Sequence, residues 1–150
     1  MIDINLTGVF NLARPAVAAM VGLSGAEDAP TLPRRFVAVA SAAAQFGLPQ
    51  LAAYTAAKHG VAGLVRALAA ETALHGITAN AVSPGSTDTT MLAESAAIYG
   101  LDHQSSFAEQ ARIGRLIEPD EIAATVAWLC GPDAGAINGA VVPVDGGFRG

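Results

Sequence analysis

The sequence has few charged residues, few aromatic residues and almost no cysteine. Charged side chains make up 14% of the 150 residues, and 13 acidic against 8 basic residues leave a formal net charge of -5. Proteins that bind nucleic acid or anionic membrane surfaces need a clustered excess of Lys and Arg. The basic residues here are scattered along the chain, so we expect neither kind of partner.

The scarcity of cysteine and histidine excludes two further kinds of site. Cys130 has no partner for a disulfide within the chain, and it ends an apolar run that begins at Val126, which predicts an inert thiol in the core. His59, His75 and His103 are far apart in the sequence. With so few ligands, we expect no metal-binding cluster.

Long uninterrupted apolar runs are also absent. A helix that spans a membrane needs about 20 predominantly apolar residues, and every run of that length here contains Gly, Pro or a charged residue. The N-terminus has no basic segment of the kind that begins a signal peptide. We therefore expect a cytoplasmic protein without a membrane partner.

The chain does have a high apolar content of 52% and 16 glycines, which is typical of a closely packed α/β protein. Its length suits one domain, residues 1–150, with its own core. Helical periodicity alternates with short apolar runs, which predicts an α/β fold with a parallel sheet. The expected helices cover 1–21, 53–74 and 118–130, the expected strands cover 36–40, 77–82 and 140–144, a polar linker covers 22–35, and an irregular segment with short helices near 91–99 and 106–113 covers 89–115.

Tyr54 and Lys58 stand four residues apart in the second expected helix, so both side chains project from the same face. A phenol in water loses its proton only near about pH 10, and a neighbouring ammonium favours the charged phenolate. The pair is therefore a candidate general acid/base. The same spacing is also typical of a solvated edge of an ordinary helix.

Polar and glycine-rich segments follow all three expected strands. Ser41 comes directly after the first strand, the run 83–89 follows the second, and Asp145-Gly146-Gly147 follows the third. Ligands of open parallel sheets bind beyond the carboxyl ends of the strands. Ser41 and Tyr54 could then flank one small carbonyl or alcohol, although a serine at a strand end is more often a cap.

Five short motifs carry a family resemblance: Asn5-x-x-Gly8, Ser41, Tyr54-x-x-x-Lys58, Asn80-x-x-x-Pro84-Gly85 and Asp145-Gly146-Gly147. In this order and spacing they resemble the carboxyl-terminal portion of the short-chain dehydrogenase/reductase family, over essentially the whole chain. The resemblance implies a partial Rossmann-like, doubly wound parallel sheet. Within that family the run from Asn80 to Thr89 is most similar to the mycofactocin-coupled oxidoreductases. A dihydrodiol-type dehydrogenase subgroup shares part of the same run.

The resemblance implies a catalytic set of four residues. Tyr54 would exchange a proton with the substrate hydroxyl, and Lys58 would favour its phenolate and bind the nicotinamide ribose. Ser41 would polarise the substrate oxygen. Asn5 would hold a water that links Lys58 to solvent, although an asparagine there is more often an ordinary residue of a helix start.

The resemblance also implies a cofactor, NAD or NADP, with NAD favoured by the subgroup. Pro84 and Gly85 would let the loop approach the nicotinamide, and Thr87 and Thr89 would lie near its carboxamide, while Tyr54 and Lys58 would complete the cofactor contacts. The substrate would be a small alcohol or ketone. Apolar residues near the site favour a hydrophobic one, and a homo-oligomer, typically a homotetramer, is implied for the full-length protein.

The amino-terminal, nucleotide-binding half of such a fold is not recognisable in the chain. Neither Gly-x-x-x-Gly-x-Gly nor Gly-x-Gly-x-x-Gly occurs, so the chain corresponds to the last three strands with their flanking helices. We expect a fragment of a longer oxidoreductase. The alternative is a truncated, inactive remnant that acts as a subunit-interaction module through its two long helices.

Overall fold

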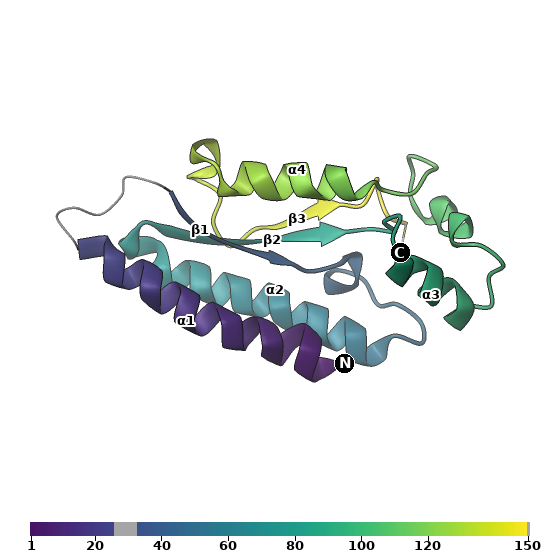
Figure 1. The fold of residues 1–150 in the computed structure, drawn as a ribbon, viewed down its shortest axis with the longest axis horizontal. Helices are drawn as coiled ribbons and strands as arrows, with labels where there is room; N and C mark the ends of the chain where they lie inside the picture. Colours follow the sequence, from purple (N-terminus) through teal and green to yellow (C-terminus); the bar gives the residue numbers. More distant parts are fainter. Residues whose placement is uncertain (26–32, 150) are drawn as a thin grey trace.

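A computed structural model describes residues 1–25 and 33–149 and shows a parallel sheet between two layers of helices (Figure 1). α1 (Gly8–Gly22) and α2 (Ala52–Thr72) lie on one face of the sheet, and α4 (Pro119–Cys130) lies on the other. α3 (Thr90–Ile98) lies beyond one end of the sheet. The predicted α/β fold with helices on both faces is confirmed.

The sheet contains β1 (Arg34–Val39), β2 (Ile77–Pro84) and β3 (Val141–Val144), in the order β1-β2-β3. Both pairs are parallel, as the alternation of helices and strands predicted. β1 begins two residues before the apolar run that indicated it, because Arg34 and Arg35 also pair with β2. Residues 26–32 of the expected linker lie outside the described residues.

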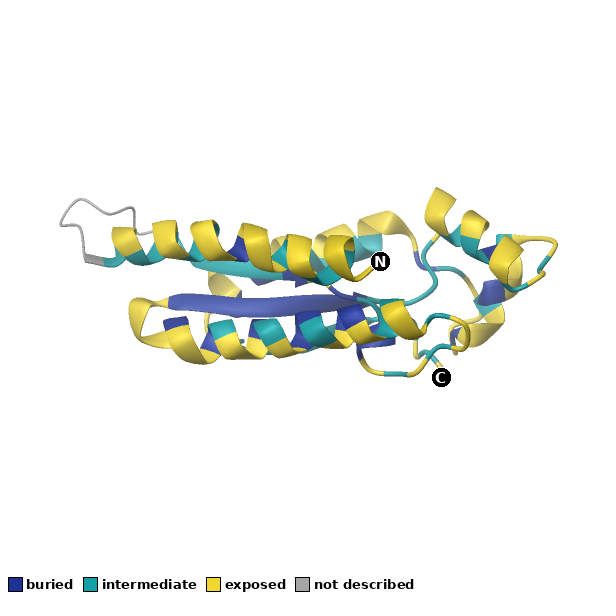
Figure 2. Cartoon of the chain, turned by 90° about the horizontal axis from the view of Figure 1, so that it is seen from below, coloured by how far each residue is buried: buried dark blue, intermediate teal, exposed yellow. Residues whose placement is uncertain are grey.

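The larger part of the core lies between the sheet and α2. Val61, Val65 and Ala69 of α2 are at most 5% exposed, and they pack with Ala79 and Ala81 of β2. Figure 2 shows this buried interior and the exposed outer faces of the helices. Because most of these side chains are small, helix and sheet approach closely, which explains the alanine-rich composition.

A second core cluster lies between the sheet and α4. Leu129 and Val82 are fully buried there. Cys130, the next residue of α4, is exposed, so the expectation of a core thiol is wrong. Successive residues of a helix point in directions about 100° apart, so the buried Leu129 turns Cys130 toward solvent.

The ends of the helices follow the local signals in the sequence. α2 continues as the 3-10 turn η4 (Ala73–His75) and stops at Gly76, whose φ of 67° is left-handed and suits glycine. α4 has Pro119 in its first turn and a capping box between Glu118 and Glu121. Other short 3-10 turns are η2 (Leu23–Gly25), η3 (Ala42–Ala44) and η6 (Pro132–Ala134).

The first expected helix consists of a π-helical turn, η1 (Asp3–Thr7), followed by α1. The stretch Asp3–Gly22 is long and apolar enough to cross a membrane by length and composition alone, with a mean hydropathy of 1.2. In the fold it forms part of a helical layer, because η1 packs against α2 and α1 packs against both α2 and β1.

The irregular segment after β2 contains α3 and a 3-10 helix, η5 (Gln104–Gln110). The expected short helix at 91–99 is therefore present as α3. The helix expected at 106–113 is instead the more tightly wound 3-10 helix η5, which begins two residues earlier. Two side-chain hydrogen bonds join this segment to the loop after β2: Gln104 Nε2 donates to Asp88 Oδ1 at 2.6 Å, and Ser86 Oγ donates to Gln110 Oε1 at 2.9 Å.

Candidate functional site

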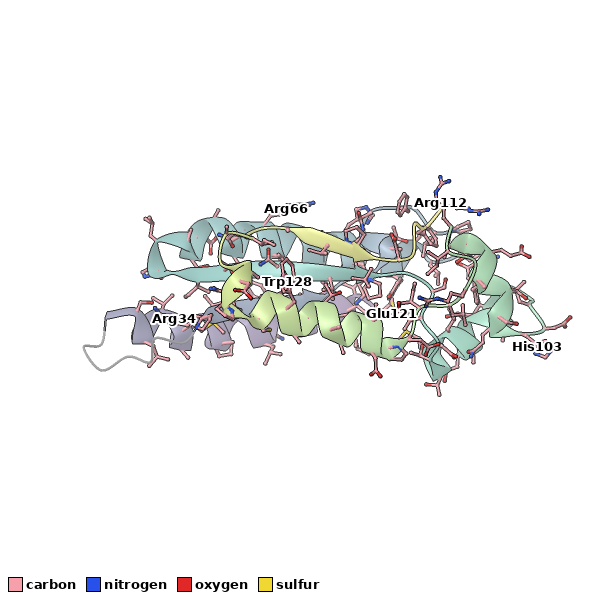
Figure 3. All side chains as sticks on the ribbon, turned by 90° about the horizontal axis from the view of Figure 1, so that it is seen from above. Arg34, Arg66, His103, Arg112, Glu121 and Trp128 are labelled. Atoms are coloured by element: carbon pink, nitrogen blue, oxygen red, sulfur yellow. The ribbon has the colours of Figure 1, made fainter. Side chains whose placement is uncertain are left out.

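The predicted site lies at the carboxyl end of the sheet, where the ends of β1, β2 and β3 meet α3 and η5 (Figure 1). Arg34, at the start of β1, lies at the other end of the molecule from His103 and Arg112 (Figure 3). All three strands are parallel, so the segments that follow them gather at this one end.

Ser41 follows β1 and caps η3. Its Oγ accepts a hydrogen bond from Ala43 N at 3.2 Å, so the side chain does act as the strand-end cap that was the simpler interpretation. The cap uses only a lone pair of the hydroxyl oxygen, and the hydroxyl hydrogen remains free for another acceptor. η3 packs against α2, the helix that carries Tyr54 and Lys58. Capping and donation to a substrate are therefore compatible.

Tyr54 and Lys58 lie on adjacent turns of α2, as their spacing predicted. Lys58 Nζ lies 5.5 Å from the centroid of the Tyr54 ring. Tyr54 is half-buried, and its hydroxyl makes no hydrogen bond with any residue that the structure describes. The phenol hydroxyl is thus available to a substrate oxygen.

Lys58 is nearly buried, with 8% of its surface exposed. Its Nζ donates to the backbone carbonyl of Val39, the last residue of β1, at 3.0 Å. Burial lowers the pKa of the Lys58 ammonium below 10.5, because the charged form loses solvation. The carbonyl takes one of three ammonium hydrogens, which leaves donors for other partners.

Asn5 forms no hydrogen bond with Lys58 among the described residues. It lies in η1, and its Nδ2 donates to Met1 O at 3.1 Å and lies 3.1 Å from Met1 Sδ. η1 packs against α2, partly because Gly60 leaves room for Leu6, whose Cδ2 would lie 2.7 Å from an added Cβ. Asn5 therefore lies in the helical layer that contains α2. Among the described residues, its side chain forms a hydrogen bond only with nearby Met1.

Pro84 ends β2, and Gly85 follows it beside the turn that comes after β3. Gly85 N donates to Val144 O at 3.1 Å. A Cβ at Gly85 would lie 2.8 Å from the Cα of Asp145, closer than real Cβ atoms come, so this position requires glycine. The Asp145 carboxylate accepts from Gly147 N at 2.9 Å and closes its own turn.

Thr87 and Thr89 shape the loop between β2 and α3. Thr87 Oγ1 donates to Gly85 O at 3.0 Å, and Thr89 Oγ1 donates to Thr87 O at 3.2 Å. Thr89 also caps α3, because its Oγ1 accepts from Leu92 N at 3.3 Å. Both hydroxyl hydrogens are used within the loop, so toward a ligand these side chains can act only as acceptors.

Two polar residues outside the predicted set also lie at this end of the sheet. Ser83 is fully buried, donates from Oγ to Ser41 O at 2.7 Å, and accepts from Gln45 Nε2 at 2.7 Å. The sequence signal for Ser83 was its place at the start of the polar run 83–89 that follows the second expected strand. Gln45 gave no signal, because its partner is 38 residues away.

A further contact crosses from α3 to the loop that precedes α2. Tyr99 OH donates to Pro49 O at 2.8 Å, and the Tyr99 ring packs edge-on against Phe107 at 5.8 Å between centroids. A cavity of about 490 Å³ lies nearby in the α3–η5 segment. Its lining includes Ala96, Leu101 and His103, and none of the predicted catalytic residues.

A metal centre is not formed by the part of the chain that the structure describes. Within residues 1–25 and 33–149, no group of three or more His, Cys, Asp and Glu side chains is placed to hold a metal ion. The arrangement at the carboxyl end of the sheet offers instead a free phenol, an ammonium and a hydroxyl donor. Such groups suit proton transfer and stabilisation of a developing alkoxide.

Comparison with known proteins gives matches along almost the entire chain. A family model described as enoyl-(acyl carrier protein) reductase matches residues 1–149. A-factor type gamma-butyrolactone 1'-reductase (1S-forming) of Streptomyces virginiae is 38% identical over 148 residues, which are 99% of this chain and 54% of that protein. Cyclohexanol dehydrogenase of Acinetobacter sp. (strain SE19) is 35% identical over 148 residues, which are 99% of this chain and 53% of that protein.

A solved structure also matches along almost the entire chain. A variant of actinorhodin polyketide ketoreductase with NADPH superposes with a TM-score of 0.84 at 34% identity, over 95% of this chain and 55% of that one. The chain thus spans about half the length of the relatives that it matches.

Proposed function

Because the chain belongs to the short-chain dehydrogenase/reductase family, we propose that it carries the catalytic residues of an oxidoreductase that interconverts a secondary alcohol and a ketone with NAD or NADP. The observation that carries the proposal is the Tyr54 hydroxyl, which has no hydrogen-bond partner within residues 1–25 and 33–149, with the Lys58 ammonium 5.5 Å from its ring. Relatives whose names denote a reductase, a cyclohexanol dehydrogenase and a ketoreductase support this substrate class.

In the direction of alcohol oxidation, the Tyr54 phenolate accepts the hydroxyl proton of the substrate. Ser41 donates its hydroxyl hydrogen to the same oxygen and stabilises the negative charge that develops there. The hydride acceptor is the nicotinamide of the cofactor when it is bound. In the direction of ketone reduction, Tyr54 returns the proton to the substrate oxygen.

The positive charge of Lys58 stabilises the negative charge that the Tyr54 oxygen carries during proton transfer. The hydrogen bond to Val39 O holds the ammonium near the Tyr54 ring. The proposed proton relay would continue through a water at Asn5. Asn5 Nδ2 donates to Met1 O, so Oδ1 is the atom that would accept from such a water.

The residues at the carboxyl end of the sheet fit a nicotinamide cofactor. The hydroxyl oxygens of Thr87 and Thr89 can accept from a carboxamide, and Gly85, packed closely against Asp145, sets the course of the loop that carries them. Lys58 has donors left for a ribose. We propose that the nicotinamide is held by these four residues together with Tyr54 and Pro84. The resemblance of the 80–89 run to the mycofactocin-coupled subgroup favours NAD, and NAD and NADP binding should be compared directly.

The test is Tyr54→Phe in the full-length protein, assayed by nicotinamide absorbance with a panel of secondary alcohols and ketones. Loss of a general acid/base lowers turnover by about 100- to 10,000-fold. Cofactor affinity, measured by nicotinamide fluorescence, should change far less, because only the phenol hydroxyl is removed. Turnover retained by Tyr54→Phe would refute the assignment.

A matched control is available on the next residue. Thr55 Oγ1 is buried without a hydrogen-bond partner among the described residues, so Thr55→Val removes a hydroxyl from the same turn of α2 at little cost. We expect Thr55→Val to keep turnover near the level of the unmodified protein. A loss equal to that of Tyr54→Phe would indicate general damage to α2.

The second candidate function, a subunit-interaction module without catalysis, is favoured by one feature of the surface. A groove of about 370 Å³ lies between α1 and α2 and has an apolar lining that includes Phe10, Val17, Leu64 and Leu68. Phe10 is 50% exposed there. Such a face suits a homo-oligomer, which we also propose for the active protein.

Two measurements on the full-length protein separate these functions. An interaction module should self-associate in sedimentation velocity and lose association on Leu68→Arg, while neither NAD nor NADP alters nicotinamide fluorescence. Cofactor binding and Tyr54-dependent turnover would refute the module without catalysis and support the oxidoreductase.

A further inference from the structure

We propose that Ser83 is a positioning residue for Ser41, acting through a partly buried hydrogen-bond relay that runs from Gln45 through Ser83 to the backbone carbonyl of Ser41. The inference rests on the proposed function, in which the Ser41 hydroxyl donates to the substrate oxygen. It states that Ser83 affects kcat by holding Ser41 in the position for that donation. Neither Ser83 nor Gln45 belongs to the catalytic set that the family resemblance implied.

The direction of the relay follows from the chemistry of its members. The Ser41 carbonyl can only accept, so the single hydroxyl hydrogen of Ser83 must point to it across the 2.7 Å contact. Ser83 Oγ is then an acceptor toward Gln45, which must present its amide Nε2 at 2.7 Å. Both bonds are short, and the hydroxyl between them is fully buried. Hydrogen bonds in such a chain polarise and strengthen one another.

The relay holds Ser41 at the backbone and leaves its side chain available. Ser41 O also accepts from Ala44 N at 2.8 Å, so both of its lone pairs are occupied. Ser41 Oγ accepts from Ala43 N at 3.2 Å. With these acceptor contacts in place, the orientation of the Ser41 backbone is defined, and its hydroxyl hydrogen is left for the substrate.

The relay also connects two parts of the fold that are distant in the chain, β2 and the segment 41–45 that follows β1. Ser83 is the penultimate residue of β2, Ser41 follows β1, and Gln45 follows η3. Ala40 N donates to Val82 O at 2.8 Å, which extends the β1–β2 pairing to the residue before Ser41. A change in the position of Ser83 Oγ therefore shifts the Ser41 carbonyl through a single hydrogen bond. The geometry of a reacting group strongly affects the reaction rate.

The test uses Ser83→Ala and Gln45→Leu in the full-length protein. Ser83→Ala removes the donor to Ser41 O, and we expect it to lower kcat by about five- to tenfold with little change in cofactor affinity. Gln45 is exposed, so Gln45→Leu should fold normally and lower kcat less. Ser83→Thr keeps the hydroxyl and should restore part of the lost kcat.

Two double variants distinguish positioning from general destabilisation. If Ser83 acts through Ser41, Ser83→Ala should cause no further loss of kcat in a Ser41→Ala background, and Gln45→Leu should cause none in a Ser83→Ala background. The loss of Tm should persist in each case. Independent, multiplicative losses of kcat, or an unchanged kcat in Ser83→Ala, would overturn the positioning role.

Thr72→Val provides the matched control for a buried hydroxyl. Thr72 Oγ1 donates to Leu68 O at 2.7 Å near the far end of α2, and the residue is 4% exposed. We expect Thr72→Val to lower Tm about as much as Ser83→Ala while kcat stays unchanged. A protein without Tyr54-dependent turnover would refute the proposed function and the positioning role together, whereas Tyr54-dependent turnover with independent losses would refute only the positioning role.

Discussion

Lys58 Nζ and the backbone carbonyl of Val39 form a 3.0 Å hydrogen bond that ties α2 to the last residue of β1. Val39 lies two residues before Ser41, so this bond joins α2, which carries Tyr54, to the strand that leads to Ser41. The ammonium gains one carbonyl partner and loses most of its water, since Lys58 is 8% exposed. Burial accordingly lowers its pKa.

This lowered pKa makes stability depend on pH in a defined direction. Between the lowered pKa of Lys58 and its ordinary value of 10.5, the unfolded chain binds more protons than the native state. The free energy of unfolding should therefore rise with pH through this interval. Below the interval the folded protein carries the full cost of the buried charge.

Lys58→Met removes the titrating group, so its profile should lack this rise. The measurement is urea denaturation of both proteins from pH 7 to about pH 10.5. Arg66→Met is the control, because Arg66 is an exposed cation on the same helix and arginine stays charged throughout. Parallel profiles for Lys58→Met and the unmodified protein would contradict the expectation.

Gly85→Ala should destabilise the fold. The added Cβ would lie 2.8 Å from the Cα of Asp145, and backbone on both sides cannot yield as a side chain can. We expect a loss of about 1–3 kcal/mol in the free energy of unfolding, measured in urea. Gly47→Ala, where a Cβ meets nothing within 4 Å, should be nearly neutral. Equal effects at both positions would argue against the close approach.

Tyr99→Phe should loosen the segment formed by α3 and η5. The change removes the hydrogen bond to Pro49 O at 2.8 Å and keeps the ring contact with Phe107. Limited proteolysis within residues 89–115 should become about fivefold faster, while Tm changes little, because local opening governs cleavage. Unchanged cleavage rates would show that the hydroxyl does not hold this segment.

The lowered pKa of Glu121 predicts that the folded protein loses stability in acid. Figure 3 shows it at the start of α4, and Arg115 holds it with two hydrogen bonds of 2.7 and 2.8 Å. The Arg115 guanidinium, and then the backbone N–H of Glu118, lower the pKa of Glu121 from 4.5 to about 2. The contribution is therefore present above pH 4.5 and disappears as the pH falls toward 2.

Glu121→Gln should flatten this part of the acid profile, as followed by Tm between pH 5 and pH 2. Arg115→Gln should reproduce most of the change, since Arg115 is the largest cause of the lowered pKa. Identical acid profiles for the unmodified protein and Glu121→Gln would count against the assigned linkage.

The sequence by itself determined the order of the elements, the parallel sheet and several helix ends. These features depend on local patterns: the 3.6-residue period, the glycine at position 76, and Pro119 followed by acidic residues. Tyr54 and Lys58 were recognisable for the same reason, because residues four apart on a helix share a face. Their catalytic roles stay predictions.

Only the tertiary structure decided which distant groups meet. The bond from Lys58 to Val39, the relay through Ser83, and the contact from Tyr99 to Pro49 join residues 19 to 50 positions apart. The prediction that Cys130 is buried was wrong, because an apolar run does not reveal which side of a helix faces the sheet. Such contacts depend on how strands and helices pack, and no local pattern encodes them.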